Sequence, residues 1–356
     1  MGKTYRIAVI GGDGIGPEVV REGLRVLDRV AKIEGFQVQL TSYPFGAEHY
    51  LKTQEIFPEA AFSEVKQHDA ILLGAIGDPR IEVGLLEFGI IAKMRFELDL
   101  FVNLRPVQLH AEHLCPLKDT RPEDVNFTVV RENTEDAYAG MRGFFKKGTP
   151  DEIATQEIIF TRKGVERVMR YAFDLARKRP RKHLTLIDKA NAVRAMDLWT
   201  RTFAEVGAEY PDVQREHHYI DAACMYVVKT PEWYDTVVTS NMFGDIFTDL
   251  SAMIQGGLGV AASGNIHPGR VSLFEPIHGS APKYTGQNVA SPIATIMAVS
   301  MLLDYVGEPR AASRIEETVA GLLRSKKLPS LGTDSGFSTS AVGDLVIEAL
   351  EQPAKV

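Results

Sequence analysis

The chain alternates short, continuous apolar runs with longer segments of helical periodicity. The first apolar run, residues 5–10, is followed by a helical pattern over residues 18–31. Similar runs recur, and each ends in glycine or polar residues. They cover residues 69–77, 127–130, 184–187, 236–240 and 271–274. Short buried strands that alternate with helices predict an α/β protein with a largely parallel sheet covered on both faces.

Four further segments complete the predicted order. Residues 292–306, 312–323 and 338–350 again show helical periodicity. Residues 143–161 break the alternation and have strand character. This last segment predicts a hairpin, which is either an ordinary surface hairpin or an arm that pairs with another subunit.

A glycine-rich turn, residues 11–17, joins the first predicted strand to the first predicted helix. Such a turn invites comparison with the G-x-G-x-x-G dinucleotide fingerprint, but the spacing does not match. Asp13 occupies the third position of the frame from Gly11, and the frames from Gly12 and Gly14 end on Pro17 and Val19. The sequence therefore predicts a fold other than the Rossmann fold, with a turn whose backbone can approach a ligand closely.

Polar side chains follow several of the predicted strands. Ligands of open α/β sheets bind beyond the carboxyl ends of the strands. The polar residues at these ends are Arg131, Lys189, Asn241 with Asp245, and His278. Their repetition at several strands favours a binding site over ordinary solvated loops.

A helix is predicted to begin after residues 236–240, with Asn241 as its N-cap. Asp245 and Asp249 are four residues apart, so both lie on one face and repel each other. A divalent cation would turn this repulsion into attraction, because hard cations bind carboxylate oxygens. The alternative is a solvated acidic face. The predicted apolar stripe of this helix consists of Phe243, Ile246, Phe247, Leu250 and Ile254.

Composition narrows the class of protein. The chain has 356 residues, of which 45% are hydrophobic and 24% charged, as expected for a globular enzyme of two domains. No apolar run is long enough to span a membrane, and the N-terminus does not resemble a signal peptide. Two cysteines, Cys115 and Cys224, indicate free thiols in a reducing cytoplasm. The net charge of −7 argues against general nucleic-acid binding.

Three arginines, Arg95, Arg105 and Arg131, are candidates for substrate binding. The planar guanidinium fork binds carboxylates in bidentate fashion, so three together would hold a substrate with two carboxylates. Each of them could instead form a surface ion pair.

Asp221 is a charge inside an otherwise apolar segment, and it adds a third carboxylate to the candidate metal site. Aspartates without a histidine or cysteine cluster favour magnesium or manganese over zinc. Tyr138 and Lys189 are candidate acid–base groups whose pKa a cationic site would lower. The alternatives are a core tyrosine and a surface lysine.

Several long motifs, in order, resemble those of the metal-dependent β-decarboxylating dehydrogenases. This family comprises the isopropylmalate, isocitrate, homoisocitrate and tartrate dehydrogenases. The motifs are residues 12–18, 103–106, 130–134, 188–191, 241–259 and 275–282. The resemblance implies a two-domain isopropylmalate/isocitrate dehydrogenase-like fold with a large, mostly parallel mixed sheet.

The resemblance also implies an organisation. Residues 1–104 plus 257–356 would form the cofactor-binding domain, and residues 105–256 the domain for substrate, metal and dimerisation. The cleft between the domains would be the active site. The arm at about 143–161 would clasp a second subunit, which gives a homodimer with shared active sites.

Individual roles follow from the resemblance too. Tyr138 and Lys189 would be catalytic, with Tyr138 reprotonating carbon and Lys189 taking the proton of the 2-hydroxyl. Arg95, Arg105, Arg131 and Asp221 would bind substrate. Asp221, Asp245 and Asp249 would hold Mg²⁺ or Mn²⁺, with Lys189 and Asp221 reaching in from the partner subunit. The cofactor contacts would be Asn191, Glu275, His278, Gly279, Ser280, Ala281, Lys283, Tyr284 and Ser291.

Residues 83–95 resemble the isopropylmalate branch most. Leu85, Leu86, Ile90 and Ile91 suit an isopropyl group and not a third carboxylate, although the same residues fit a helix core. Residues 130–135 are closer to isocitrate and homoisocitrate enzymes. Isocitrate, homoisocitrate and tartrate dehydrogenase activities, and a non-catalytic regulatory subunit, are therefore the alternatives.

NAD is the expected cofactor, because the isopropylmalate branch uses it, and NADP is the alternative. Lys283 stands where NAD-using relatives carry an aspartate, and a lysine favours the 2′-phosphate of NADP. Thr230 stands where NADP enzymes would have a basic residue from the other subunit. Ser291 stands where an asparagine is usual near the adenine. The stretch 333–338 also lacks the tyrosine and arginine of NADP enzymes.

Overall fold

The computed structural model describes residues 2–333 and 335–352, so Asp334 in the stretch compared with NADP enzymes lies outside the described residues. The chain forms two compact units. Unit 1 comprises Met1–Leu100, Gln108–Pro122 and Ala252–Val356, and unit 2 comprises Phe101–Val107 and Glu123–Ser251. Residues 108–122 thus belong to unit 1, whereas the sequence expectation places them in the second domain. No helix among the described residues is long and apolar enough to cross a membrane.

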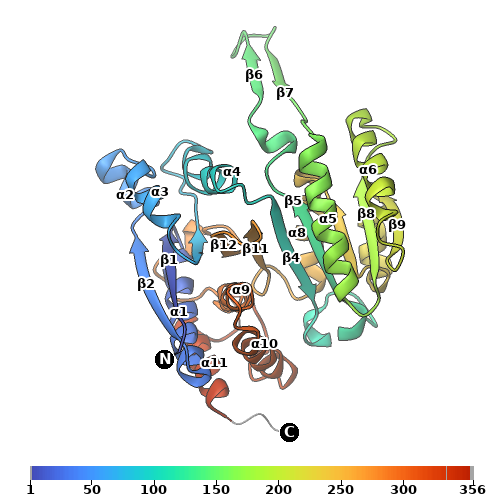
Figure 1. Ribbon diagram of the computed structural model, residues 1–356. Helices are drawn as coiled ribbons and strands as arrows, with labels where there is room; N and C mark the ends of the chain where they lie inside the picture. The colour runs from blue at the N-terminus through green and yellow to red at the C-terminus, as the bar shows by residue number, and fades with distance from the viewer. Residues whose placement is uncertain (1, 334, 353–356) are drawn as a thin grey trace. The chain divides into compact units, whose positions relative to one another are not determined.

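Unit 1 contains a sheet region with the strand order β2-β1-β3-β12-β11. The first four strands are parallel, and β11 is antiparallel to β12. Helices α1 and α9 pack against these strands, α10 packs against α1 and α9, and α11 packs against α1 and α10 (Figure 1). The strands are β1 (Thr4–Gly12), β2 (Gln37–Tyr43), β3 (Ala70–Ala75), β11 (Ala262–Ile266) and β12 (Ser272–Pro276). The helices are α1 (Gly16–Glu34), α2 (Ala47–Thr53), α3 (Glu59–Val65), α4 (Lys93–Glu97), α9 (Ile293–Tyr305), α10 (Pro309–Arg324) and α11 (Thr339–Glu351).

Unit 2 has the strand order β4-β5-β10-β8-β9, in which β5, β10, β8 and β9 are parallel. A separate antiparallel hairpin of β6 and β7 extends away from this unit (Figure 1). The strands are β4 (Val102–Gln108), β5 (Asn126–Glu132), β6 (Arg142–Phe145), β7 (Ile153–Gln156), β8 (His183–Asp188), β9 (Gln214–Tyr219) and β10 (Thr236–Thr239). The helices are α5 (Arg162–Lys178), α6 (Asp197–Gly207), α7 (Ile220–Lys229) and α8 (Asn241–Ile254).

The short turns of helix complete the list. They are the π-helical turn η1 (Glu87–Ala92) and the 3₁₀ turns η2 (Glu112–Leu114), η3 (Pro122–Asp124), η4 (Asp136–Ala139), η5 (Arg194–Met196), η6 (Pro231–Trp233) and η7 (Pro282–Tyr284).

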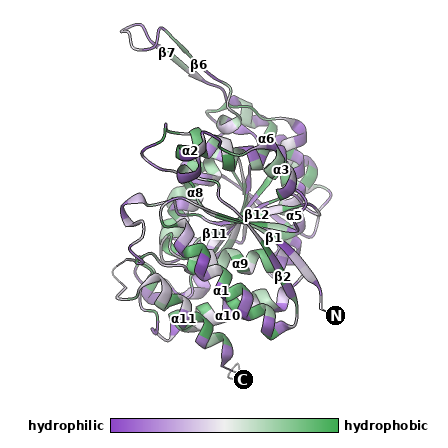
Figure 2. Cartoon of the chain, turned by 90° about the vertical axis from the view of Figure 1, so that its left-hand side faces the viewer, coloured by the Kyte–Doolittle hydropathy of each residue, from purple (hydrophilic) through white to green (hydrophobic). Residues whose placement is uncertain are grey.

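The burial of each helix follows its sequence pattern. Helices α1 and α10 carry both hydrophilic and hydrophobic residues (Figure 2), and each buries one face. Helix α9 is apolar around most of its circumference, and nine of its 13 residues are buried. The apolar periodicity at 18–31, 292–306 and 312–323 therefore predicted these three helices correctly.

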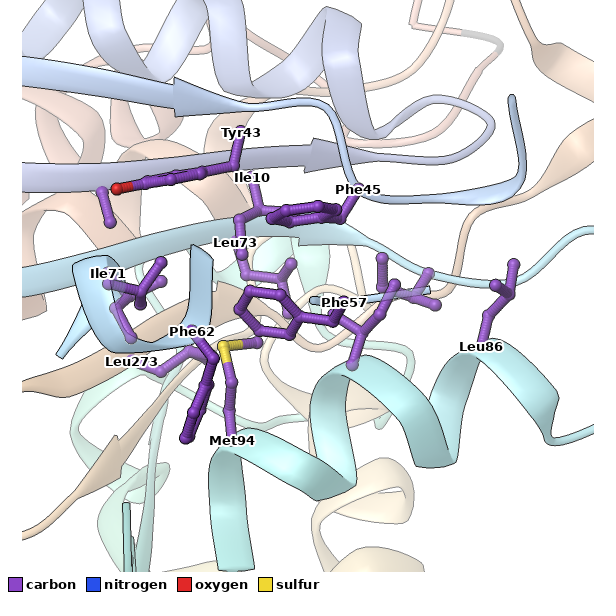
Figure 3. Packing of buried hydrophobic residues seen from close by; sticks show 14 of the residues in the cluster. Ile10, Tyr43, Phe45, Phe57, Phe62, Ile71, Leu73, Leu86, Met94 and Leu273 are labelled. Carbon is purple, nitrogen blue, oxygen red and sulfur yellow. The ribbon is translucent and has the colours of Figure 1, made fainter. Parts of the chain in front are cut away.

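The hydrophobic core of unit 1 includes part of the segment expected to contact the substrate. Leu86 is 1% exposed and belongs to this core (Figure 3). Ile90 is fully buried in the same core. Leu85 and Ile91 are partly buried and pack against it. Leu86 and Ile90 therefore contribute to the core, which is the alternative that the sequence left open for this segment, and Leu86 also lines a cavity of unit 1. Contact of this segment with an isopropyl group stays a prediction.

Candidate active site

The centre of the candidate site is the contact between Arg131, at the end of β5, and Asp245 in α8. Arg131 is only 2% exposed, and its Nη1 donates to Asp245 Oδ1 at 2.6 Å. Its Nε donates to the carbonyl oxygen of Asn241 at 2.8 Å, and its Nη2 donates to Asn241 Oδ1 at 2.7 Å. A Cβ at Gly244 would lie 2.4 Å from Arg131 Cγ. Glycine at this position therefore allows α8 to pass directly over the arginine.

Arg105, on β4, meets the same helix face. Its Nη2 lies 3.2 Å from Asp245 Oδ1, and its Nη1 lies 3.5 Å from Asp249 Oδ1. Nη1 also donates to Thr248 Oγ1 at 2.6 Å, while Nε donates to Asn103 Oδ1 at 2.7 Å. The structure thus brings Arg105 and Arg131 together at the paired aspartates, with both guanidinium groups held by neighbouring side chains.

Tyr138, in η4, joins this cluster. Its hydroxyl donates to Asp245 Oδ2 at 3.2 Å, and the Arg131 guanidinium lies 5.8 Å from the centre of its ring. Burial, followed by the charge of Asp245, raises the pKa of Tyr138. Without a cation beside Asp245, the phenol therefore stays protonated as a donor.

Asp245 and Asp249 present oxygen atoms to solvent, with side chains 37% and 58% exposed. Burial raises the pKa of Asp249, and the charge of Asp245 adds to this effect. A hard divalent cation would relieve the repulsion between the two carboxylates, so this donor set fits Mg²⁺ or Mn²⁺. Across residues 2–333 and 335–352, however, no three His, Cys, Asp or Glu side chains gather to hold a metal ion. Asp221 of the same chain does not complete the set.

Asp221 is paired with Lys189 instead. Lys189 follows β8 and Asp221 lies in the first turn of α7, and their Nζ and Oδ1 atoms are 2.7 Å apart. This hydrogen bond lowers the pKa of Asp221. The Asp221 side chain is 69% exposed, so the pair can be reached from solvent.

Arg95, in α4 of unit 1, contacts Glu275 of β12. Its Nη2 donates to Glu275 Oε1 at 3.1 Å, and Asn265 Nδ2 donates to the same oxygen at 2.8 Å. Arg95 Nε is buried and makes no hydrogen bond with the described part of the chain. Arg95 therefore keeps a donor for a ligand, whereas one oxygen of Glu275, expected at the cofactor, is used by Arg95.

A cavity of about 500 Å³ in unit 1 lies beside the predicted cofactor loop. Gly77, Asp78, Ser280, Ala281 and Pro282 are among its lining residues. Such a volume accommodates part of a dinucleotide. Gly77 and Gly279 are among the lining residues, so a flat or phosphate-bearing ligand can approach the backbone closely there.

His278, at the start of this loop, is held in one orientation. One ring nitrogen, Nδ1, lies 3.0 Å from the carbonyl oxygen of Gly279. The other, Nε2, is buried without a hydrogen-bond partner among the described residues. Burial lowers the pKa of His278 and favours the neutral ring. An unpaired buried ring nitrogen next to the cavity fits a cofactor contact.

The remaining predicted cofactor residues lie in different settings. Lys283 Nζ is 4.6 Å from the centre of the Tyr284 ring in η7. Ser291 Oγ accepts the Ile293 N–H at 3.4 Å at the start of α9. Asn191 is exposed in a turn of unit 2.

Helix α8 differs from the prediction in two respects. The helix begins at Asn241, whose side chain binds Arg131 and does not act as the N-cap. Asp136 Oδ2 accepts the N–H of Met242 instead, at 2.9 Å. Ile246, predicted in the apolar stripe, is 54% exposed. Close packing of Gly244 on Arg131 turns Ile246 toward solvent.

Asn103, Thr248 and Asn241 orient the two arginines, and sequence reasoning assigned them no such role. The available signal was their position in motifs that also contain the arginines and aspartates. Asn103 binds Arg105 within β4, whereas Thr248 and Asn241 reach their arginines through contacts of α8 with β4 and β5, which lie far from α8 in the sequence.

Comparison with known proteins confirms the resemblance. A family model described as isocitrate/isopropylmalate dehydrogenase matches residues 6–346. The 3-isopropylmalate dehydrogenase of Thermobifida fusca is 48% identical over 354 residues, which cover 98% of this chain and 99% of the relative. That of Frankia casuarinae is 51% identical over 324 residues, which cover 90% and 93%.

Solved structures agree with the fold. The crystal structure of isocitrate dehydrogenase from Methylococcus capsulatus superposes with a TM-score of 0.88 at 35% identity, covering 98% of this chain and 100% of that chain. The expected α/β class with a large, mostly parallel mixed sheet is therefore confirmed. The chain belongs to the isocitrate/isopropylmalate dehydrogenase family.

Proposed function

We propose that this chain catalyses the oxidative decarboxylation of 3-isopropylmalate to 4-methyl-2-oxopentanoate, a step of leucine biosynthesis, with reduction of NAD in the presence of Mg²⁺ or Mn²⁺. The observation that carries the proposal is the cluster of Arg105 and Arg131 on Asp245, with Asp249 and Tyr138 beside it. The curated relatives described above are named 3-isopropylmalate dehydrogenase, which favours this substrate within the family.

The proposed mechanism assigns each step to a residue. Arg105 and Arg131 bind the substrate carboxylates through their guanidinium groups, and Arg95 offers its unpaired Nε for the same purpose. Asp245 and Asp249 would hold a divalent cation, which would supply Lewis acidity toward the 2-hydroxyl. Lys189 would accept the hydroxyl proton, and bound NAD would supply the hydride acceptor for C2. The resulting β-keto acid loses CO₂, and the protonated hydroxyl of Tyr138 returns a proton to carbon.

We propose further that two copies share each site in a homodimer. Asp221 does not gather with Asp245 and Asp249 among the described residues of one chain, and it is paired with Lys189, so a second copy would supply both. The β6–β7 hairpin carries apolar side chains suited to pairing, since Phe144, Phe145 and Ile153 are 58%, 60% and 55% exposed. Both cysteines are free thiols, which suits the cytoplasm.

Isocitrate or homoisocitrate remains the second candidate substrate, and NADP the second candidate cofactor. The loss of Leu86 and Ile90 to the core weakens the argument for an isopropyl pocket, although Leu85 and Ile91 are only partly buried. Lys283, near the predicted cofactor loop, favours a 2′-phosphate by charge.

A complementation experiment tests the shared site. Lys189→Met and Asp245→Asn should each abolish activity, because each removes one required group from every site. In a hybrid dimer that contains one subunit of each variant, one site has both groups intact. An equimolar refolded mixture should therefore regain about a quarter of wild-type activity, because half of the dimers are hybrids. A mixture that regains no activity would contradict the sharing of sites between subunits. Wild-type activity in either single variant would contradict the assignment of Lys189 or Asp245 to the site.

A further inference from the structure

Asp13, in the turn after β1, connects the loops at the carboxyl ends of three neighbouring strands. It is 5% exposed, and its Oδ1 accepts the Ala47 N–H at 2.6 Å, while its Oδ2 accepts the Gly77 N–H at 2.9 Å. Ala47 begins α2 after β2, and Gly77 follows β3. Both bonds are charge-assisted, because the acceptor is a carboxylate.

The same turn also holds the loop that carries the predicted cofactor contacts. The Ile15 N–H donates to the carbonyl oxygen of Ser280 at 2.9 Å, and Ser280 Oγ donates to the carbonyl oxygen of Gly77 at 2.6 Å. Gly77 is bonded in turn to Asp13, so these contacts form a closed ring through Asp13, Ile15, Ser280 and Gly77. Neither loop can shift without breaking a bond of the ring.

Glycines in and near the turn permit these close approaches. A Cβ at Gly14 would lie 1.9 Å from the carbonyl oxygen of Ser280, and a Cβ at Gly46 would lie 2.6 Å from Asp13 Oδ1. Both residues also have positive φ angles, 59° and 154°. The glycine-rich turn that fails the dinucleotide fingerprint therefore has a different use, which is contact between loops.

The ring borders the cavity of about 500 Å³, because Gly77 and Ser280 both line it. We propose that Asp13 is a positioning residue for the nicotinamide cofactor, which keeps the two loops around Gly77 and Ser280 at the spacing that the cofactor requires. The proposal rests on the proposed function for the identity of the ligand. Asp13 acts through Gly77 and does not contact the cofactor itself.

Asp13→Asn tests the proposal with little change of shape. The amide replaces one acceptor oxygen by an N–H₂ group, so one backbone N–H then faces another donor. We expect KM for NAD to rise about tenfold, while kcat and KM for 3-isopropylmalate change less than about twofold. The affinity of the free enzyme for NADH, measured by fluorescence titration, should fall by the same factor. A merely structural role would lower the amount of active enzyme and leave both cofactor values unchanged.

Asp69→Asn is the matched control. Asp69 Oδ2 accepts the Arg6 N–H at 2.7 Å and so joins the region before β3 to β1 at the opposite end of these strands. One acceptor oxygen remains in asparagine, so this variant should keep wild-type KM for NAD and wild-type affinity for NADH.

Two further variants test the proposal even if the Asp13→Asn protein does not fold. Ala47→Pro removes only one of the two donors, at a helix position that tolerates proline, and should raise KM for NAD less than Asp13→Asn does. Gly46→Ala displaces the carboxylate without changing its charge and should weaken NADH binding. Unchanged NADH affinity in Gly46→Ala, or in folded Asp13→Asn, overturns the proposal. If the wild-type enzyme binds NADH but does not oxidise 3-isopropylmalate, the proposed substrate is contradicted. NADH binding by the variants then still decides the role of Asp13.

Discussion

Gly244 shows how one residue without a side chain shapes the candidate site. It lies inside α8, where glycine normally weakens a helix, and it makes room for the buried Arg131. The arginine can then reach Asp245 and both oxygen atoms of Asn241. Here the packing of α8 against Arg131 outweighs the usual preference of helices for helix-forming residues.

Gly244→Ala should therefore destabilise the protein and lower kcat/KM for the substrate, because the new methyl group displaces Arg131. We expect a loss of about 1–3 kcal/mol in the free energy of unfolding, as for other overpacked sites. Gly321→Ala is the control, since Gly321 lies within α10 and has open space around its Cβ position. That change should stabilise the protein by about 0.5–1 kcal/mol. Urea unfolding of both variants and steady-state kinetics measure the difference, and equal effects would contradict the packing argument.

Glu132 makes stability depend on pH. It is 1% exposed, and burial raises its pKa to about 7 from an ordinary value of 4.5. Between these two pH values the folded state keeps a proton that the unfolded state has lost. The free energy of unfolding contributed by this group is therefore fully present below pH 4.5 and is lost as pH rises through about 7.

Glu132→Gln should remove this dependence. The difference in unfolding free energy, wild type minus variant, should fall by up to about 3 kcal/mol between pH 4.5 and pH 8. The variant also carries a cost at every pH, because its N–H₂ group would face a backbone N–H of Thr134 or Glu135. Chemical unfolding across this pH range measures the difference, and a constant value would show that Glu132 titrates normally.

At the scale of elements, continuous apolar runs were the most dependable signal. Runs of this kind predicted β1, β3, β5, β8, β10 and β12, and the strand character of residues 143–161 predicted the β6–β7 hairpin. Which face of a helix is buried was less predictable. The π-helical turn η1 departs from the ordinary helical register, and Leu86 and Ile90 lie in the core. Ile246 fits an apolar period yet is exposed, because contacts of α8 with Arg131 decide its orientation.

The β6–β7 hairpin gives a prediction about assembly. Phe145→Ser should weaken the proposed homodimer and reduce activity, because Phe145 is 60% exposed at a surface proposed to pair with a second copy. Leu51→Ser is the control, since Leu51 on α2 is 42% exposed. Sedimentation velocity across a range of protein concentrations measures the dissociation constant. Equal dissociation constants for the two variants and wild type would exclude Phe145 from the subunit contact.

At the scale of the whole molecule, the sequence motifs identified the charged residues of the candidate site better than the residues that support them. Arg105, Arg131, Asp245 and Asp249 meet within unit 2. Asn103 received no role, although it binds Arg105 only two residues away. Thr248 and Asp13 received none, because their hydrogen bonds join segments that are distant in sequence. Periodicity and spacing report the local chain and contain no information about such partners.

The central claim concerns the reaction, and one comparison of substrates tests it most directly. Purified wild-type protein with Mg²⁺ is assayed for nicotinamide reduction with 3-isopropylmalate, isocitrate, homoisocitrate and tartrate, each with NAD and with NADP. The highest kcat/KM should belong to 3-isopropylmalate with NAD, and chelation of the metal should abolish it. A higher kcat/KM for isocitrate, homoisocitrate or tartrate would contradict the proposed substrate, and activity that survives complete removal of the metal would contradict the proposed mechanism.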